Sequence, residues 1–250
     1  MAGHMVIFGP GYCGSRIAHA LEARGWRVTR AGRACAEPFA DAPDSVLSTV
    51  PPWEDGDPVL LRFGNMIQRG PLRWIGYLSS TGVYGDTGGA WVDETAPLKG
   101  RRGPRLIADQ QWLELGAHVL RLPGIYGPGR SAIDRVAEGK AHRLDLPDQV
   151  FSRIHVADVV GGVLAALGGP AGAYNLSDDL PCSQNRVVEA AASLLGQVPP
   201  PMQSLEAAAL SPAARAFYAE NRRVANGKAK RLLGWKPRYP TYAEGLAACL

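Results

Sequence analysis

Three glycines near the start of the chain constrain its fold more strongly than any other feature. Gly9, Gly11 and Gly14 form the pattern Gly-x-Gly-x-x-Gly between the apolar run 5–9 and the amphipathic stretch 15–25. A glycine turn between a buried strand and a helix lets a pyrophosphate approach the backbone and the free N–H groups of the helix start. The spacing predicts a dinucleotide-binding turn, with a glycine turn that holds no ligand as the alternative. The residues expected to contact the dinucleotide here are Gly9, Pro10, Gly11, Tyr12, Cys13 and Gly14.

The second expected strand, at 25–34, carries two arginines where NAD-binding proteins carry an acid. About 20 residues beyond the glycines, such proteins place a carboxylate against the ribose 2′-hydroxyl. Here Arg30 and Arg33 occupy that region, and the first acid after them is Glu37. Because guanidinium groups suit a 2′-phosphate, we predict NADP as the cofactor ahead of NAD. The alternative for both arginines is ordinary surface charge at the end of a strand.

Apolar runs alternate with helical patterns along the rest of the chain. Further strands are expected at 46–50, 73–79, 118–124 and 173–178, and helices at 15–25, 105–116, 156–169 and 183–196. This alternation predicts an α/β fold with a doubly wound parallel sheet that helices cover on both faces. Only about a dozen residues separate the second strand from the next apolar run. We therefore expect the usual third strand to be short or absent.

Composition narrows the classes of function. Hydrophobic residues make up 46% of the 250-residue chain, enough for a buried core. The basic residues are scattered, and we interpret the densest cluster, 221–231, as a solvated helical face; no nucleic acid partner is expected, and the surplus of cations fits a pocket for an anion. The four cysteines are widely spaced, so neither a disulfide framework nor a metal site is predicted. Without a signal-peptide pattern or an apolar stretch of about 20 residues, we expect a cytoplasmic protein that does not contact membranes.

A stretch rich in hydroxyl groups follows the expected strand 73–79. In "LSSTGVYGD" (78–86), Ser79, Ser80 and Thr81 end an apolar run just before glycines. Such hydroxyl groups either cap a turn or line the rim of an active site. The local pattern leaves both interpretations open.

Several motifs occur in one order along the chain. After "GPGYCG" come "LSSTGVYGD", "VDETAPL", "LRLPGIYGPG", "RIHVADVV" and "AKRLLGWKPRYPTYAEGL". This collinear set resembles the NAD(P)-dependent epimerase/dehydratase, or extended, branch of the short-chain dehydrogenase/reductase superfamily over essentially the whole chain. The resemblance implies a Rossmann domain formed by residues 1–128 and 154–180. A smaller, mostly C-terminal substrate-binding lobe would comprise residues 129–153 and 181–250.

The resemblance also implies roles in an active site. Ser80, four residues before Tyr84, would hydrogen-bond the reacting oxygen. The Tyr-x-x-x-Lys pair of the family falls on Arg101 and Arg105, within a helix expected over the stretch 100–115. Arginine stays protonated near neutral pH, so neither residue replaces the proton transfer of the tyrosine. We expect an atypical member, in which Arg101 holds an anionic group of the substrate and Arg105 binds ribose or phosphate oxygens.

Further positions follow from the same resemblance. The adenosine half of the cofactor would pass Thr49, Val50 and Pro51. The nicotinamide end would contact Ser79, Pro123 and Gly124. Tyr84 is the nearest alternative proton carrier, with a packed tyrosine as the other interpretation. Residues that match family positions and are expected to have structural roles or to line the pocket are Asp93, Glu94, Tyr126, His155 and Asp158.

Two classes of function remain open from the sequence. The first is an NADP-preferring oxidoreductase or epimerase-like enzyme, which transfers a hydride to or from a small polar, anionic substrate with an altered catalytic set. The second is a protein that binds NADP(H) without turnover, as a redox sensor or a regulatory partner. A homodimer is compatible with either.

Overall fold

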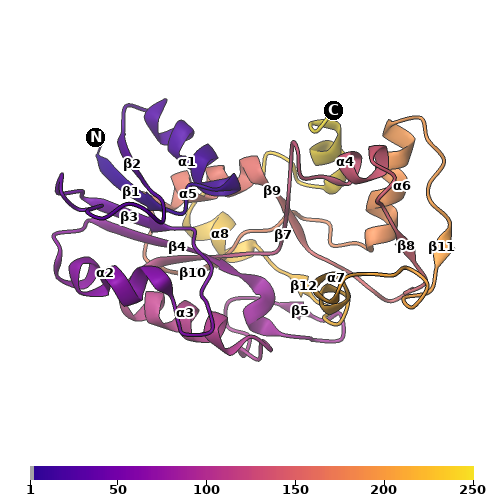
Figure 1. Cartoon of the computed structure of the whole chain (residues 1–250), viewed down its shortest axis with the longest axis horizontal. Helices are drawn as coiled ribbons and strands as arrows, with labels where there is room; N and C mark the ends of the chain where they lie inside the picture. Colours follow the sequence, from indigo (N-terminus) through magenta and orange to yellow (C-terminus); the bar gives the residue numbers. More distant parts are fainter. Residues whose placement is uncertain (1–2) are drawn as a thin grey trace.

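The structure, a computed structural model, describes residues 3–250 apart from the side chains of 213 and 214, and it is built around a six-stranded parallel sheet (Figure 1). The strand order is β10-β6-β4-β3-β1-β2. This arrangement confirms the doubly wound α/β fold expected from the sequence. The strands are β1 (His4–Phe8), β2 (Arg27–Ala31), β3 (Ser45–Ser48), β4 (Trp74–Ser80), β6 (His118–Leu122) and β10 (Gly172–Asn175).

Helices cover both faces of the sheet because its central strands are apolar on both sides. Met5 and Ile7 of β1 pack on one face with α1 (Tyr12–Glu22) and α5 (Val156–Ala166). Val6 and Phe8 point to the other face, into the core formed with α2 (Pro58–Arg69) and α3 (Gly103–Glu114). In Figure 1, α1 and α5 lie above the sheet and α2 and α3 below it. The two hydrophobic clusters hold the sheet between helix layers, as parallel sheets require.

The sheet ends at β2, where a third strand of the usual fold would follow. Among the described residues, the segment 32–44 contains no strand and returns directly to β3. Thirteen residues are too few for a helix and a strand together, so the expectation of a missing third strand is confirmed. Phe39 from this segment packs against Phe8 and Phe63, with ring centroids 6.1 Å and 5.9 Å away. The segment therefore closes the lower core without extending the sheet.

Helix α2 was not predicted from the sequence, although its start carries a recognisable signal. The Asp57 carboxylate accepts hydrogen bonds from the amides of Val59 and Leu60, and Pro58 stands in the first turn. An acidic N-cap followed by proline is typical of a helix start. Trp112 of α3 donates its indole N–H to the same carboxylate over 2.9 Å. Asp57 thus joins the two helices of this face.

A second, smaller group of elements lies at the other end of the molecule, on the right in Figure 1. Its core is formed by α4 (Ala132–Ala137), α6 (Gln184–Leu194) and α9 (Tyr242–Ala247). Among the described residues, three short parallel strand pairs form separate two-stranded sheets outside the large sheet. The pairs are β5 (Trp91–Val92) with β12 (Arg223–Val224), β7 (Gly124–Tyr126) with β9 (Arg153–His155), and β8 (Arg143–Leu144) with β11 (Met202–Gln203). The remaining short elements are the 3₁₀ turn η1 (Thr81–Tyr84), α7 (Pro212–Phe217) and α8 (Gly227–Leu232).

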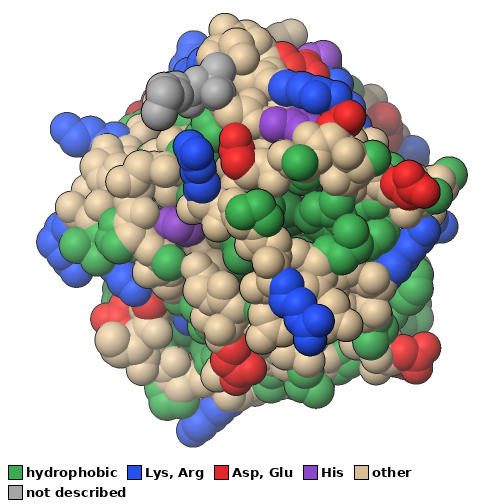
Figure 2. Space-filling view, turned by 90° about the vertical axis from the view of Figure 1, so that its left-hand side faces the viewer, with side chains coloured by type: hydrophobic (Ala, Val, Ile, Leu, Met, Phe, Trp, Pro, Cys, Tyr) green, Lys and Arg blue, Asp and Glu red, His purple; other side chains and the backbone are tan. Residues whose placement is uncertain are grey.

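The surface of the sheet-bearing end is mixed in charge. Figure 2, which looks onto this end, shows lysine and arginine side chains spread among acidic and apolar ones. None of the helices within residues 3–250 combines the length and the hydrophobicity that a bilayer-spanning helix needs.

A buried ion pair joins helix α3 to strand β6. The guanidinium group of Arg121 donates to both carboxylate oxygens of Asp109, over 2.6 Å and 3.1 Å, and the two side chains are 3% and 0% exposed. The hydroxyl of Ser79, from β4, donates to the same carboxylate over 2.6 Å. Arg121 also donates to the hydroxyl of Tyr84 over 3.0 Å. One helix, two strands and the turn after β4 are thereby fixed to each other.

Removal of the carboxylate from this pair should destabilise the whole sheet. Asp109→Ala leaves the Arg121 cation buried without a partner, so we expect the free energy of unfolding to fall by roughly 3–5 kcal/mol. Urea denaturation measures this change. Glu138→Ala breaks the exposed pair with Lys140 and should cost less than about 1 kcal/mol. Similar losses in the two variants would contradict a structural role for the buried pair.

Candidate active site

The glycine turn combines a tight bend, a close contact and an open face. Gly9 has a φ of +80°, and its amide donates to the carbonyl of Ala31, at the end of β2, over 3.1 Å. A Cβ at Gly14 would lie 2.4 Å from the Gly9 carbonyl oxygen, so the close approach of α1 requires glycine there. A Cβ at Gly11 would meet no atom within 4 Å. The backbone is therefore open at the middle glycine, where a phosphate group would have to approach.

Helix α1 begins at this turn with its N-terminus uncapped. Gly11 is the N-cap residue, Tyr12 is the first helical residue, and no side chain caps the helix. Such a helix start leaves backbone N–H groups available to an anion. The hydroxyl of Thr49 donates to the Gly9 carbonyl over 2.6 Å and so holds the turn, while Cys13 packs against the core. Pro10 lies half-exposed within the turn.

Two cations that sequence reasoning missed flank Tyr12. The guanidinium carbon of Arg16 lies 4.0 Å from the centre of the Tyr12 ring, and that of Arg130 lies 5.6 Å from it. The Tyr12 hydroxyl donates to the carbonyl of Pro128 over 3.2 Å. Arg16 follows Tyr12 by one helical turn, a spacing visible in the sequence, whereas Arg130 comes from a distant loop. Both add positive charge beside the start of α1.

The two arginines expected at the 2′-phosphate differ in their surroundings. Arg30 forms a two-pronged ion pair with Glu22, in the last turn of α1, with both N–O distances 2.7 Å. Arg33 lies just beyond the end of β2 and is exposed, and no residue within the described chain is bonded to its guanidinium group. Of these two arginines, Arg33 is the one whose guanidinium group forms no ion pair with a described residue.

The segment after β3 lies against the glycine turn, as expected for residues that pass the adenosine half. A Cβ at Gly9 would lie 2.9 Å from both Thr49 Oγ1 and Val50 Cγ2. Pro51 follows them and is exposed. Contact of these three residues with a cofactor remains a prediction.

A cavity of about 250 Å³ opens at the carboxyl ends of β4 and β6, the edge where open α/β sheets bind their ligands. We call it the Ser80 cavity. It brings together five of the predicted site residues, from three separate parts of the chain. Its lining consists of Ser80, Thr81, Gly82, Arg101, Arg102, Arg105, Pro123, Gly124, Phe151, Ser152, Ala216, Phe217, Glu220, Arg222 and Val224.

Ser80 and Ser79 have opposite orientations, because successive side chains of a strand point to opposite faces. The Ser80 oxygen accepts a hydrogen bond from the amide of Gly82 over 3.1 Å, so its own proton is left to donate into the cavity. Ser80 therefore both caps the turn η1 and lines the cavity. Ser79 is buried, donates to Asp109 and is not part of the cavity lining. Its proposed contact with the cofactor has no support from this geometry.

The arginine pair does not have the arrangement expected for the Tyr-x-x-x-Lys motif. Helix α3 begins only at Gly103, with Pro104 in its first turn, so Arg101 lies outside the helix that carries Arg105. Proline in the first turn prevents the helix from continuing backwards, because its ring clashes with the preceding turn. Arg101 instead donates to the carboxylate of Glu220 and to the carbonyl of Ala216, both over 2.9 Å. The expected helix over 100–115 is wrong in its first three residues.

Arg105 is a half-buried cation without a counter-ion. No hydrogen bond or ion pair of its guanidinium group occurs among the described residues. Burial lowers the pKa of Arg105, and the neighbouring charge of Arg102 acts in the same direction. Arginine remains charged even so. The wall of the cavity next to Ser80 thus carries an uncompensated positive charge.

Arg222 is a site residue that sequence reasoning missed. The cluster 221–231 is helical only from Gly227, where α8 begins; before it, Arg223–Val224 form strand β12 against β5. Arg222 donates to the Glu220 carboxylate over 2.6 Å and to the Gly85 carbonyl over 2.7 Å. Arg222 and Val224 both line the cavity, as the alternation of a strand requires. The partner strand, which decides this placement, lies more than 100 residues away in the sequence.

Arg222 also approaches Ser80. A Cβ built on Gly82 would lie 3.3 Å from Ser80 Oγ and 3.9 Å from Arg222 Nη2. The serine hydroxyl and the guanidinium group thus point to the same small volume.

Tyr84 is a packed tyrosine and is not part of the cavity lining. It is 1% exposed; its hydroxyl donates to the Asn175 side chain over 2.8 Å and accepts from Arg121. Burial raises its pKa above the ordinary value. These contacts fit the structural alternative considered for Tyr84 and give no support to its role as a proton carrier.

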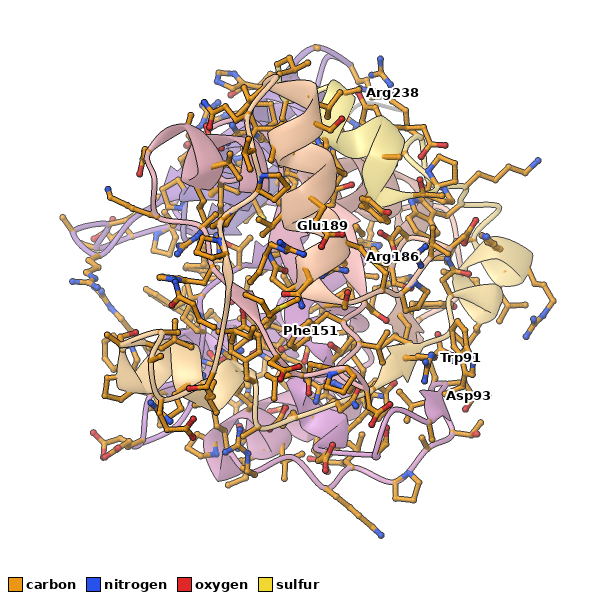
Figure 3. All side chains as sticks on the ribbon, turned by 90° about the vertical axis from the view of Figure 1, so that its right-hand side faces the viewer. Trp91, Asp93, Phe151, Arg186, Glu189 and Arg238 are labelled. Carbon is orange, nitrogen blue, oxygen red and sulfur yellow. The ribbon has the colours of Figure 1, made fainter. Side chains whose placement is uncertain are left out.

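The other residues considered from the sequence are held in structural contacts. Glu94 accepts from the amide of Asn175 over 2.7 Å, and Asp93 lies at the surface, as Figure 3 shows. His155 caps α5 through Nδ1, and burial lowers its pKa to about 4. Asp158 accepts from the amides of Arg238 and Tyr239. Glu94 and Asp158 thus join segments that are distant in the sequence, and none of the four residues is part of the lining of the Ser80 cavity.

Tyr126 and Asp178 form a buried polar pair without hydrogen-bond partners. The Tyr126 hydroxyl and both carboxylate oxygens of Asp178 lack partners among the described residues. Burial raises the pKa of Asp178 to about 7, while the charge of Arg153 acts in the opposite direction. The carboxyl group therefore takes up a proton in the folded protein at a pH where it is ionised in the unfolded chain.

Comparisons with known proteins fit this geometry. No family model matches the sequence. A conserved protein of unknown function from Silicibacter pomeroyi DSS superposes with a TM-score of 0.91 and 39% identity, over 99% of this chain and 98% of that one. A 3-diazoavenalumate denitrifying reductase from a Streptomyces species is 36% identical over 157 residues, which are 57% of this chain and 49% of the reductase. The aligned region thus spans about half the length of that relative.

Solved structures of lower identity share the fold along their whole length. MoeE5 in complex with UDP-glucuronic acid and NAD superposes with a TM-score of 0.80 and 18% identity, over 98% of this chain and 97% of that one. Others are epimerases and a dehydratase named for nucleotide sugars. At such identities the likeness shows the fold. It agrees with the Rossmann-type fold that the motifs predict.

The buried carboxyl group of Asp178 should make stability fall as the pH rises. Below about pH 4 the group is protonated in both states; between about pH 4 and pH 7 only the unfolded chain releases the proton. Asp178→Asn has no proton to release in this range. The free energy of unfolding of this variant should therefore exceed that of the wild type by an amount that grows from about pH 4 to pH 7, to roughly 4 kcal/mol at most. Denaturation at several pH values measures it, with the exposed Asp55→Asn as control. An advantage that does not change with pH would contradict the assignment.

Proposed function

We propose that this chain, which belongs to one family with the Silicibacter pomeroyi protein and has the extended short-chain dehydrogenase/reductase fold, is an NADP(H)-dependent reductase of a small anionic substrate. One observation carries the proposal. An open glycine turn and a cation-lined cavity with a free serine hydroxyl lie at the same carboxyl edge of one parallel sheet.

The residues at the glycine turn fit a dinucleotide. The open face at Gly11 and the uncapped start of α1 suit a pyrophosphate. Arg33 would hold a 2′-phosphate, and the segment 49–51 would pass the adenosine. Pro123 and Gly124 lie in the wall of the Ser80 cavity, where the nicotinamide end would reach it. When bound, the dinucleotide supplies or accepts a hydride.

The residues of the Ser80 cavity suit the reduction of a carbonyl group, because they would stabilise the developing alkoxide until solvent supplies its proton. Oxidation of a hydroxyl group needs a base that takes up its proton. Among the lining residues, Glu220 is the one carboxylate; burial tends to raise its pKa, but hydrogen bonds from Arg222 and Arg101 lower it below the ordinary value. A carboxylate held by two guanidinium groups is a weak base. Donors, in contrast, are abundant: Ser80, Arg105 and Arg222 face the place where an oxyanion would develop.

The name of one relative also favours reduction as the direction of hydride transfer. The Streptomyces relative is named as a reductase, and its stated substrate is the organic anion 3-diazoavenalumate. The neighbours of lower identity are named for nucleotide sugars and share only the fold with this chain. We place this chain with the reductase.

A second function is favoured by the missing tyrosine. With Arg101 outside the helix and Tyr84 buried, no described residue takes the position of the family's proton carrier. A protein that binds NADP(H) without turnover, as a redox sensor, would need no such group.

The relative affinities for NADPH and NADH test the proposed contact of Arg33 with the 2′-phosphate. We expect NADPH to bind more tightly than NADH. Arg33→Ala should weaken NADPH roughly tenfold to hundredfold, because a hydrogen bond to a charged group is lost, and should leave NADH unchanged. Arg30→Ala should have a smaller effect, since Glu22 already holds that guanidinium group. Calorimetric titration of the wild type and both variants measures these affinities.

Glycine variants provide the matched control for this titration. Gly11→Val should abolish the binding of both dinucleotides while thermal unfolding stays unchanged, because its side chain meets no protein atom. Gly168→Val, at an equally open glycine in the loop after α5, should bind normally. Equal wild-type affinities for NADPH and NADH, or normal binding by Gly11→Val, would refute the cofactor assignment.

Turnover separates the enzyme from the sensor. We expect the protein to oxidise NADPH with members of a panel of small aldehydes, ketones and 2-oxo acids. We expect no reduction of NADP⁺ when UDP-glucose is the substrate. Ser80→Ala should lower the rate by about 10²-fold, the usual effect of losing one oxyanion donor. Absorbance of the reduced nicotinamide follows the reaction. Tight NADPH binding without turnover on any member of the panel would favour the sensor.

A further inference from the structure

We propose that the Ser80 cavity selects a small aromatic carboxylate and rejects nucleotide sugars. The inference rests on the proposed function for its chemistry, but the binding of the acid can be measured without turnover. Four features carry it: the excess of arginines, their distance from the serine, the size of the cavity and its aromatic wall.

The charges that line the cavity favour an anionic ligand. Four arginines and one glutamate line it. Glu220 binds two of them, Arg101 and Arg222, through separate carboxylate oxygens. Arg102 and Arg105 have no counter-ion within the described part of the chain. The planar fork of a guanidinium group matches a carboxylate with two parallel hydrogen bonds.

The position of the charges places the anionic group of the ligand next to its reacting atom. Ser80 Oγ and Arg222 Nη2 lie 3.3 Å and 3.9 Å from the same point above Gly82. A small acid carries its carboxylate within a few bonds of the group that is reduced. In a nucleotide sugar, a sugar ring separates most of the reacting carbons from the diphosphate. The convergence of serine and arginine thus favours the small acid.

The size of the cavity also favours a small acid over a nucleotide sugar. Its volume of about 250 Å³ lies below the usual range of roughly 300–1,000 Å³ for ligand pockets, and the nicotinamide end must share it. Arg101 donates to the carbonyl of Ala216, in α7, and so holds this helix against the lining of the cavity. A nucleotide with two rings and a diphosphate exceeds this space.

The apolar wall of the cavity is aromatic. The rings of Phe151 and Phe217 stack with centroids 4.3 Å apart and an angle of 14° between their planes. Phe151 is buried and is labelled near the centre of the view in Figure 3, whereas Phe217 is 48% exposed. Val224 and Pro123 complete this side. A flat ring in the ligand would pack on this wall while its carboxylate faces the arginines.

The binding of trans-cinnamate tests the proposal, since this acid joins a phenyl ring to one carboxylate. We expect calorimetry, with and without NADP⁺, to show at least tenfold tighter binding of cinnamate than of the neutral cinnamamide. UDP-glucose should bind more weakly than cinnamate. Arg222→Gln should weaken cinnamate at least tenfold and leave cinnamamide unchanged.

The neighbouring arginine gives a matched control. Arg223 bonds to the carbonyl of Gly89 and does not line the cavity, so Arg223→Gln should bind cinnamate like the wild type. If Arg222→Gln does not fold, as judged by circular dichroism, the exposed Arg102→Gln replaces it and should also weaken cinnamate.

The outcomes separate this inference from the proposed function. Equal binding of cinnamate and cinnamamide, or tighter binding of UDP-glucose, overturns the choice of ligand even where NADPH binds. Selective binding of cinnamate supports the choice of ligand even where NADPH fails to bind. In that case only the cofactor assignment is refuted. An equal loss of cinnamate affinity in Arg222→Gln and Arg223→Gln would overturn the role of Arg222.

Discussion

The ion pair between Asp109 and Arg121 connects strand β4, helix α3 and strand β6, which position Ser80, Arg105 and Pro123 in the lining of the Ser80 cavity. Asp109 lies one helical turn after Arg105 on α3, and its carboxylate binds the hydroxyl of Ser79, the neighbour of Ser80. Arg121 lies two residues before Pro123, at the end of β6. Each wall of the cavity near the serine is thus one or a few residues from the same buried pair. Because a buried pair of charges tolerates little displacement, it fixes the distances between these walls.

With arginines at the positions of the Tyr-x-x-x-Lys pair, the Ser80 cavity is suited to bind a charged group and not to transfer a proton. A tyrosine with a neighbouring lysine takes up and releases a proton; two arginines retain theirs. Glu220 keeps the arginines from repelling one another, since it binds Arg101 and Arg222 at the same time. The cavity remains positive because two further guanidinium groups lack such a partner. Its electrostatic field is therefore suited to hold an anion and to stabilise negative charge that develops on it.

Much of the fold could be predicted from the sequence because its signals are local. The glycine turn, the alternation of apolar runs and helices, and the short segment 32–44 are each visible within a few residues. The start of α3 was also visible, since Pro104 is typical of the first turn of a helix, but the family motif suggested a longer helix. Arg222 could not be predicted in the same way. Its placement depends on the pairing of β12 with β5, and no local pattern indicates a partner so far away.

The absence of a third strand leaves the backbone of β2 at the open edge of the sheet. The edge strand of one molecule is a template on which a strand of another molecule can add. Arg27 and Arg30 of β2 are exposed, and each is bound to a carboxylate, of Asp41 and Glu22 respectively. A second chain that added to this edge would have to strip water from both ion pairs. The shortened fold thus carries, along its edge strand β2, hydrated ion pairs that disfavour aggregation through this edge.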